Sequence, residues 1–459
     1  MRKSRLALIT AILLIAALLV ACAPAPAAPA GGGAAPAPAP APPAPPAPPA
    51  APGAPTPPAA APGGDAGERP RPDDFYTRTH IVIGAARPHS GRFQSFEDTG
   101  FGVFYRNWVE EVNSRPEGGL WVEEYQRYLP IHLIRYDDTS DMGTMLMLTD
   151  RMMFEDQVDF ILPTCSSAMM TAQAEVTNQN GFLLFSAEGG ASTIVDNWQD
   201  FPYFFVTNSH SAHQVPAMVN LFQEQGLRTL FMVYLNDQHG MEYFTAVNRH
   251  FPAAGLEVVN SVMIPPDIAD MTPIIMDAMA SGADAFFLAG YAAQIYPALE
   301  IMAALDYRPG LVLFTTAITT DQFPNAFPDN PNIVEGVMGF GTWVPHSSPA
   351  TQDFYDRFRA AFPGTIIDYW THLYYEVIFE VFEQAIVAAG TLNNTEVARL
   401  MSSGYVFETI VGPVWYVQNS LAPEAYFGHI VQWQNGRPEL VDPGPGRTAD
   451  PIIPMPPWS

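Results

Sequence analysis

Short apolar runs alternate with longer amphipathic stretches from about Thr79 to about Pro443. Short apolar runs predict buried strands, whereas apolar positions at 3.6-residue spacing predict helices. The predicted strands are His80–Ala85, Ile131–Tyr136, Phe160–Leu162, Phe182–Ser186, Thr229–Tyr234, Leu256–Val262, Ala285–Leu288 and Leu311–Phe314. The predicted helices between them are Gly100–Val112, Met142–Phe154, Ala168–Thr177, Gln214–Gln225, Gly240–His250, Thr272–Ala280 and Ala293–Leu305. This alternation is typical of doubly wound parallel α/β sheets, which bind ligands beyond the carboxyl ends of their strands.

Two stretches, Glu155–Pro163 and Ser281–Gly290, share the order of helix end, turn, Asp and buried strand, which suggests two similar α/β lobes. After Trp343 the pattern is mostly helical, and aromatic residues at helical spacing are interpreted as core. The expected elements there are helices Thr351–Phe362 and Tyr369–Ala389, a short helix through Met401 capped by Asn393 or Asn394, and a strand pair Val414–Val417 with Phe427–Trp433. Asn435-Gly436 is a turn signal.

The first residues predict a targeting segment. Arg2, Lys3 and Arg5 precede an apolar run, Leu6–Val20, which is shorter than the roughly 20 residues needed to cross a bilayer. The run ends in Leu19-Val20-Ala21-Cys22, which resembles a bacterial lipobox, so residues 1–21 are expected to be a lipoprotein signal peptide and Cys22 the lipidated residue. The alternatives are an ordinary signal peptide with an incidental cysteine, or an uncleaved anchor. Residues 22–72 are a Pro/Ala-rich linker, with 19 of the 46 prolines at positions 23–72.

Composition excludes several classes of function. Lys plus Arg is 21 and Asp plus Glu is 47, so the formal charge of −26 argues against nucleic-acid binding. The only lysine is Lys3, which removes Schiff-base and P-loop chemistry from the rest of the chain. Two cysteines rule out a disulfide-rich scaffold. Neither a Gly-x-Ser-x-Gly elbow nor a His-Glu-x-x-His motif occurs, so neither an enzyme nor a cofactor is expected.

A series of short motifs resembles the type I periplasmic solute-binding proteins, the branched-chain amino acid receptors of ABC importers and their relatives. The motifs, in the family's order, are Ile81–Gly91, Tyr136–Asp141, Cys165–Ser167, Gly181–Ser186, Phe201–Phe205, His239-Gly240, Asp270–Thr272, Gly290-Tyr291, Tyr375–Val377 and Gly412–Trp415. The resemblance covers roughly residues 79–442. It implies two Rossmann-like lobes joined by three crossover segments, with a ligand in the cleft between them.

The resemblance also implies the boundaries of each discontinuous lobe. Crossovers are expected near Val206–Ser209, Gly339–Val344 and Phe407–Gly412. The first lobe would then hold residues 73–207 and 344–407, and the second lobe residues 208–343 and 408–442. Residues 443–459 would be a Pro-rich tail.

Several residues match ligand-binding positions of the family. Ser166 matches a serine that binds the ligand's carboxylate, and this contact is favoured over an ordinary N-cap, although both roles can coexist. Gly190 lies nearest a threonine position whose hydroxyl is missing here unless Ser192 replaces it. The aromatic candidates are Phe96, Tyr291 and His239, with local packing as the alternative for each.

One departure from the family concerns the ligand's ammonium. Relatives place a glutamate near Ala317 to hold that group, and a buried ammonium needs a partner. Asp321 could substitute; otherwise the ligand lacks an α-ammonium and is an amide, urea or organic acid. His210 and His213, with Asp237, could bind a metal, but solvated or capping roles are favoured. Capping and turn roles are likewise favoured over calcium for Asp137, Asp138 and Asp141.

These features predict a lipid-anchored extracytoplasmic solute-binding protein of an ABC importer. It would capture a branched-chain or related amino acid by default and present it to permease and ATPase subunits. It would sit on the membrane, facing the periplasm or the cell exterior. The alternative is a sensor with the same fold that signals through a partner, because fold alone does not separate the two.

Overall fold

The computed structural model describes residues 71–190 and 192–458. The expected signal peptide, Cys22 and nearly all of the expected linker lie outside these residues. None of the helices within them combines the length and the apolar character that crossing a bilayer requires.

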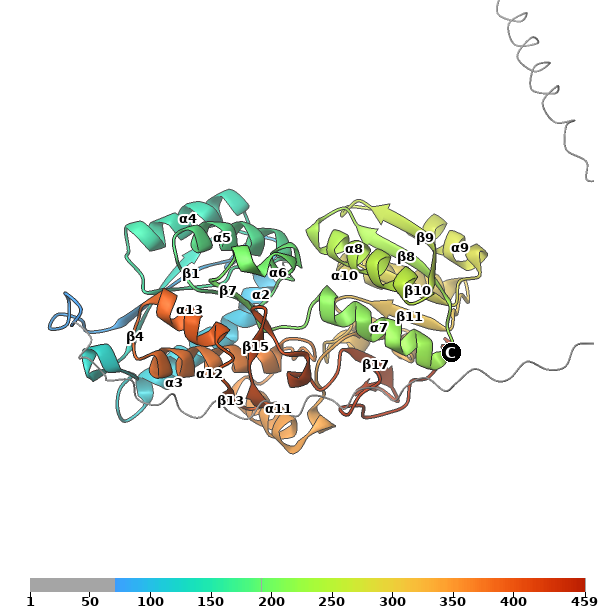
Figure 1. Cartoon of the computed structure of the whole chain (residues 1–459). Coiled ribbons are helices and arrows are strands. Elements are labelled where there is room, and N and C mark those ends of the chain that lie inside the picture. Colours follow the sequence, from blue (N-terminus) through green and yellow to red (C-terminus); the bar gives the residue numbers. More distant parts are fainter. Residues whose placement is uncertain (1–70, 191, 459) are drawn as a thin grey trace, which may run out of the picture. The chain divides into compact units, whose positions relative to one another are not determined.

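The first lobe contains a twisted sheet in two sections (Figure 1). One section has the order β4-β1-β5, and the other has the order β6-β7-β16-β15. The sections meet at a parallel bridge between Cys165 and Glu188, just beyond the ends of β5 and β6. The elements are β1 (Ile81–Arg87), α2 (Gln94–Asp98), α3 (Phe101–Ser114), β2 (Leu120–Val122), β3 (Arg127–Leu129), β4 (Ile131–Asp137), α4 (Met142–Phe154), β5 (Phe160–Leu162), α5 (Ser167–Gln179), β6 (Leu184–Ser186), α6 (Ser192–Asp196) and β7 (Phe204–Val206). Later in the chain come α11 (Pro349–Ala361), α12 (His372–Ala389), α13 (Asn394–Ser402), β13 (Phe407–Thr409), β14 (Gly412–Val414), β15 (Tyr416–Val417) and β16 (Ser420–Leu421).

The second lobe contains a seven-stranded sheet in the order β18-β17-β12-β11-β10-β8-β9. Strands β8 to β12 are parallel, and β17 and β18 join them antiparallel. The elements are α7 (Ser211–Gln225), β8 (Thr229–Leu235), α8 (Gln238–Ala253), β9 (Glu257–Ile264), α9 (Thr272–Ser281), β10 (Ala285–Ala289), α10 (Ala292–Ala304), β11 (Leu311–Phe314), β12 (Met338–Phe340), β17 (Ile430–Gln434) and β18 (Arg437–Leu440). β10 is buried along its whole length, as expected for a parallel strand covered on both faces.

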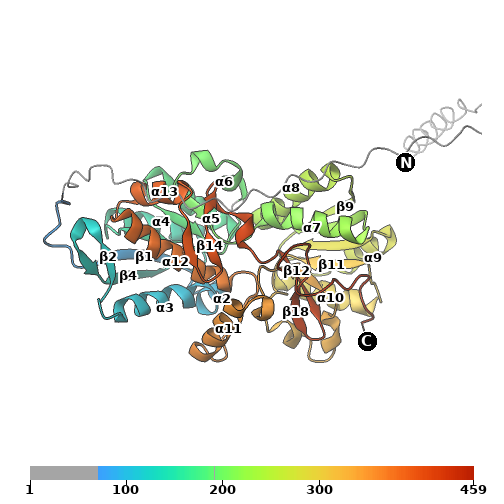
Figure 2. The same ribbon diagram turned by 60° about the horizontal axis from the view of Figure 1, so that its bottom comes forward.

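The chain passes between the lobes three times. Residues 207–210 lead from β7 to α7, and residues 341–348 lead from β12 to α11. Residues 422–429 lead from β16, which pairs with β7, to β17, which pairs with β12. Late elements therefore complete an early lobe, and Figure 2 shows the orange helices α12 and α13 beside the blue and teal elements.

The aromatic helix α12 supplies much of the first lobe's core. Phe379 stacks on Trp108 with ring centroids 4.8 Å apart and on Phe101 at 5.2 Å. Phe382 packs edge-on against Phe160 of β5 at 5.0 Å. Each such pair adds about 0.5–1.5 kcal/mol beyond the area it buries. The interpretation of these aromatic residues as core is confirmed.

The predicted strands and helices of the α/β part are all present, with ends that shift by a few residues. Asn393 caps α13, accepting hydrogen bonds from the amides of Thr395 and Glu396. The predicted pairing of the last strands is wrong, because β15 pairs with β16, and β17 pairs with β18 across the turn at Asn435-Gly436.

The last crossing and the tail also differ from expectation. The expected crossover at 407–412 is instead the β13–β14 hairpin, and β16 remains in the first lobe's sheet, so residues 408–421 do not join the second lobe. The expected tail packs onto the fold. Met455 and Trp458 are buried, and the Met455 amide donates to the Gly310 carbonyl at 3.1 Å.

Gly240 in the first turn of α8 allows this helix to start close to the end of β8. A Cβ built on Gly240 would lie 2.1 Å from the carbonyl oxygen of Leu235, which is backbone and has little freedom to move. We expect Gly240→Ala to lower the free energy of unfolding by about 3 kcal/mol, at the upper end of overpacking effects. Urea unfolding of the wild-type chain and the variant measures this loss of free energy.

The matched control is Gly143→Ala in α4. There, the nearest atom to a built Cβ is the Asp141 Oδ1 at 3.4 Å, which is ordinary contact. We expect a gain of up to about 1 kcal/mol, because alanine restricts the unfolded chain. Equal losses in the two variants would show that close packing at Gly240 is not the constraint.

Candidate functional site

The carboxyl ends of the parallel strands carry the candidate residues. In the first lobe, β5 leads to Ser166 and β6 leads to the loop with Gly190. In the second lobe, β8 leads to His239 and β10 leads to Tyr291. This is the edge at which open parallel sheets bind ligands.

Ser166 caps α5. Its Oγ accepts a long hydrogen bond of 3.5 Å from the Met169 amide, and its own amide donates to the Glu188 carbonyl at 3.1 Å. Its φ of 71° is unusual for a residue other than glycine. Such conformations cost about 1–3 kcal/mol and concentrate at functional sites. The structure therefore assigns Ser166 the capping role and leaves its half-buried hydroxyl weakly bound.

Ser167, the next residue, makes the stronger contacts, and the sequence reasoning missed it. Its Oγ accepts a hydrogen bond from the Gly190 amide at 3.1 Å and donates one to Glu242 Oε2, also at 3.1 Å. Glu242 belongs to α8, so this hydrogen bond joins the two lobes. A second bond, from Gln238 Nε2 to Thr171 Oγ1 at 2.7 Å, links the same two helices.

Glu242 is a buried carboxylate that neutral donors hold. The Ser192 amide donates to Oε1 at 3.0 Å, Ser167 donates to Oε2, and Gln238 Nε2 makes a longer contact of 3.4 Å. Burial raises the pKa of Glu242 to about 7, although these hydrogen bonds oppose the shift. Within the described part of the chain, Glu242 makes no ion pair. The expected candidates Gly190 and Ser192 thus lie together, around a group that the sequence did not indicate.

His239 and Tyr291 form an aromatic pair in the second lobe. Their rings stack at 5.1 Å with an interplanar angle of 24°. Thr315 donates to the Gly290 carbonyl, so His239 Nε2–H donates to the Thr315 Oγ1 at 3.0 Å. Burial lowers the pKa of His239 to about 4, so the ring is neutral at pH 7. The structure brings these two expected residues together, with the Tyr291 ring partly exposed.

Asp321 and Phe96 lie apart from these contacts. Asp321 forms an ion pair with Arg359 of α11 and accepts a hydrogen bond from the Ile367 amide at 3.1 Å. Its carboxylate is therefore already neutralised, which argues against the expected role as an ammonium partner. Phe96 packs edge-on against Phe93 at 6.3 Å, and its carbonyl accepts a contact from Arg87 at 3.4 Å.

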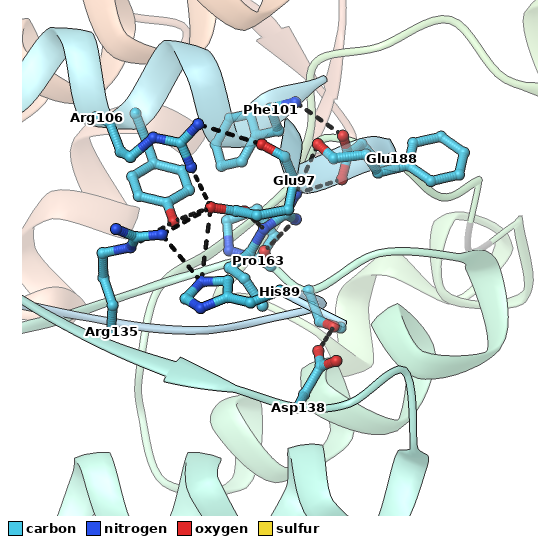
Figure 3. Close-up of polar contacts among 12 residues, drawn as sticks. His89, Glu97, Phe101, Arg106, Arg135, Asp138, Pro163 and Glu188 are labelled. Carbon is cyan, nitrogen blue, oxygen red and sulfur yellow. Dashed lines mark hydrogen bonds and ion pairs between the residues drawn. The ribbon is translucent and has the colours of Figure 1, made fainter. Parts of the chain in front are cut away.

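A buried ionic network lies behind the first-lobe loops (Figure 3). Arg87, at the end of β1, is fully buried; its Nη2 contacts Glu188 Oε2 at 2.7 Å, and its Nε contacts Glu97 Oε2 at 3.2 Å. Its Nη1 donates to the Pro163 carbonyl at 2.9 Å. Burial by itself would lower the pKa of Arg87, but the two glutamates outweigh it and raise that pKa. Glu188 therefore neutralises Arg87 and is not left to repel or attract a ligand.

Both glutamates have further partners. Glu188 Oε1 accepts hydrogen bonds from the Phe101 amide at 2.9 Å and from Tyr375 OH at 3.3 Å, which tie it to α3 and α12. Glu97 Oε1 accepts from Tyr105 OH at 2.6 Å and also pairs with Arg106 and Arg135. The network fixes the loop that leads to Gly190.

We expect Arg87→Met to lower the free energy of unfolding by about 3–5 kcal/mol, because it leaves Glu188 buried without a counter-charge. The double variant Arg87→Met/Glu188→Gln should lose less than the sum of the single variants. Urea unfolding of the wild-type chain, the single variants Arg87→Met and Glu188→Gln, and the double variant gives the coupling energy between Arg87 and Glu188. Additive losses would contradict a specific pair. Arg399→Met, in an exposed pair on α13, is the control and should change little.

Three of the other candidate polar residues are helix N-caps. His210 accepts a hydrogen bond from the Ala212 amide as the N-cap of α7, Asp237 caps α8, and Asp141 caps α4. Among the residues that the structure describes, no group of three or more His, Cys, Asp or Glu side chains is arranged to hold a metal ion.

Comparison with protein families finds one match that covers most of the chain. A sequence model of the family described as "periplasmic binding protein" matches residues 80–437. Among curated proteins, the gamma-aminobutyric acid type B receptor subunit 1 of mouse and of rat is 27% identical over 186 residues. That alignment covers 39% of this chain and 18% of the receptor, so the chain matches less than a fifth of its relative's length.

Solved structures share the fold. A solute-binding protein of an ABC transporter from Rhodopseudomonas palustris, in complex with 3,4-dihydroxy benzoic acid, is 16% identical, with a TM-score of 0.65 over 82% of this chain and 98% of that one. The leucine binding protein LivK from Thermotoga maritima is 16% identical, with a TM-score of 0.63 over 78% and 97%. A second R. palustris solute-binding protein, in complex with benzoate, is 17% identical, with a TM-score of 0.64 over 82% and 99%.

Proposed function

Because the chain belongs to the periplasmic binding protein family, we propose that it captures a small polar organic ligand between its two lobes for an ABC importer. One observation carries this proposal. A hydrogen bond joins Ser167 of the first lobe to Glu242 of the second at the carboxyl ends of both parallel sheets. Each lobe thus presents half of a polar site at the edge where such sheets bind ligands. Lobes of this kind close around ligands by hinge motion.

The first lobe offers hydrogen-bond donors, and the second offers an aromatic pair. Donors such as Ser167 Oγ–H and the Ser192 amide suit a carboxylate. No free carboxylate stands at Ala317, and Asp321 is paired with Arg359, which disfavours an α-ammonium. We therefore favour an organic acid over the amino acid that the family resemblance suggests. Both kinds of ligand occur among the similar structures, which include a leucine binding protein and a solute-binding protein in complex with benzoate.

Sensing is a second candidate, because the curated relatives are named receptor subunits. A sensor would use the same site and a signalling partner, whereas an importer uses permease and ATPase subunits. In either case, lipid at Cys22 would hold the chain on the membrane, facing the periplasm or the cell exterior.

The test is a thermal-shift screen of the purified full chain, unfolded and refolded to remove carried ligand. The panel holds amino acids, short amides, urea and aliphatic and aromatic carboxylates. A ligand at about 100 times its dissociation constant adds roughly 2.7 kcal/mol of stability, which raises Tm measurably. The family resemblance implies that the Ser166 hydroxyl donates a charge-assisted hydrogen bond to the ligand's carboxylate. Ser166→Ala should therefore weaken binding of the best ligand by about tenfold or more.

Ser348→Ala is the matched control, because Ser348 caps α11 as Ser166 caps α5. Both variants should lose about 1 kcal/mol of stability from the lost cap, and Ser348→Ala should keep full affinity. Unchanged affinity in Ser166→Ala would remove that hydroxyl from the site. A panel without any stabilising compound would count against solute binding.

The lipid anchor has its own test in a bacterial host. Cys22→Ser should move the chain from the membrane fraction to the soluble fraction and abolish labelling by a fatty-acid analogue, since acyl chains supply the membrane affinity. Cys165→Ser, at the only other cysteine, is the control and should leave both unchanged. Membrane retention of Cys22→Ser would favour an uncleaved anchor.

A further inference from the structure

Glu242 fills a position in the first lobe where a hydroxyl and a backbone amide donate to its carboxylate. It reaches that position from α8 of the second lobe, and it is only 7% exposed. We propose that Glu242 is a built-in competitor: its carboxylate occupies the place that the ligand's carboxylate takes, and the ligand must displace it. This inference rests on the proposed function above and names the ligand's anchoring group.

The donors around Glu242 are arranged to receive a carboxylate. The Gly190 amide donates to Ser167 Oγ, so the one hydroxyl proton of Ser167 is directed at Glu242 Oε2. The Ser192 amide donates to the other oxygen, Oε1, at 3.0 Å. The two oxygens therefore have separate donors, each from the first residue of a helix that follows a strand of the first lobe. Hydrogen bonds to an ionised acceptor are roughly twice as strong as neutral ones.

The space is also shaped for a carboxylate oxygen. A Cβ on Gly190 would lie 2.6 Å from Glu242 Oε2, which is closer than real contacts allow. The φ of Gly190 is not in the left-handed region, so its backbone does not require glycine. Glycine therefore permits the observed close approach of the Glu242 oxygen, and a methyl group here would push this carboxylate aside.

The hydrogen bonds of Glu242 are strong enough for it to compete with a ligand's carboxylate and weak enough for a ligand to displace it. Its contacts are all neutral hydrogen bonds, and it is buried without a cation, so water or an open site can receive it at little cost. When it leaves, Gln238 still links α8 to Thr171 of α5. When a side chain of the protein occupies the site for most of the time, the apparent affinity for the ligand equals the intrinsic affinity multiplied by the fraction of time for which the site is free. Simple carboxylates are thereby rejected, and a ligand must add contacts, such as stacking on Tyr291.

Two measurements on the full chain test this proposal. Isothermal titration calorimetry with acetate and benzoate reports carboxylate binding, and hydrogen exchange at the Ser192 amide reports whether Glu242 occupies the position. Glu242→Ala should bind the better of the two carboxylates about tenfold more tightly than the wild-type chain, or more. Ser167→Ala in that background should lose the gain. The Ser192 amide should exchange at least about tenfold faster in Glu242→Ala than in the wild-type chain.

Gly190→Ala separates the two effects. Its methyl group displaces Glu242, so exchange at Ser192 should quicken, but it also blocks a ligand carboxylate, so affinity should not rise. Glu257→Ala removes the same charge from an exposed position on β9 and should match the wild-type chain in both measurements.

Opposite results overturn the proposal. Weaker binding in Glu242→Ala would make Glu242 a partner of a cationic ligand group. Tighter binding of a carboxylate by Gly190→Ala would show that the ligand's carboxylate does not bind beside Gly190. Rapid exchange at the Ser192 amide in the wild-type chain would show that Glu242 does not occupy its position. A screened compound could stabilise the wild-type chain while Glu242→Ala gains no affinity for either carboxylate. That result would contradict the competitor role of Glu242 and leave the proposed solute binding intact. If no compound binds any of these chains, both proposals fail.

Discussion

The buried pair between Arg87 and Glu188 is the interaction on which the first lobe's half of the site depends. An unpaired charge in this position would destabilise the fold by several kcal/mol, so the two residues hold their elements together. Arg87 ends β1, and Glu188 follows β6 and bonds to α3 and α12. The loop to Gly190 and Ser192 starts at Glu188. The positions of these donors therefore depend on a buried ionic contact behind them.

The two lobes contribute opposite kinds of groups at their meeting point. The first lobe contributes a hydroxyl and amides, and the second contributes a carboxylate and two neutral aromatic rings. Neither half carries a free cation in these contacts. Under the proposal that the ligand is an organic acid, its recognition would come from oriented dipoles, whose strength grows in a buried setting. Such a site tolerates a side chain of its own as occupant because no strong ion pair has to be broken.

The alternation of strands and helices was predictable because buried parallel strands and amphipathic helices leave strong periodic patterns. β5 and α4 were predicted at their observed ends. The two-residue strands β15 and β16 leave no such pattern, so nothing in the sequence corrected the crossing that the family resemblance placed at 407–412. Long-range partners were likewise invisible: Asp321 meets Arg359, and Glu242 meets Ser192, through tertiary packing. Ser166 and Ser167 are adjacent, and only the helix start decides which hydroxyl faces the other lobe.

The three passages between the lobes also bear on how the chain is made. The first lobe's sheet is complete only when residues 416–421 have joined β7, more than 200 residues after β7 itself. The second lobe's sheet likewise waits for β17 and β18. A chain growing from its N-terminus therefore has neither lobe's sheet complete until residues 416–440 have been made, so each early half must wait unfinished for a segment far along the chain.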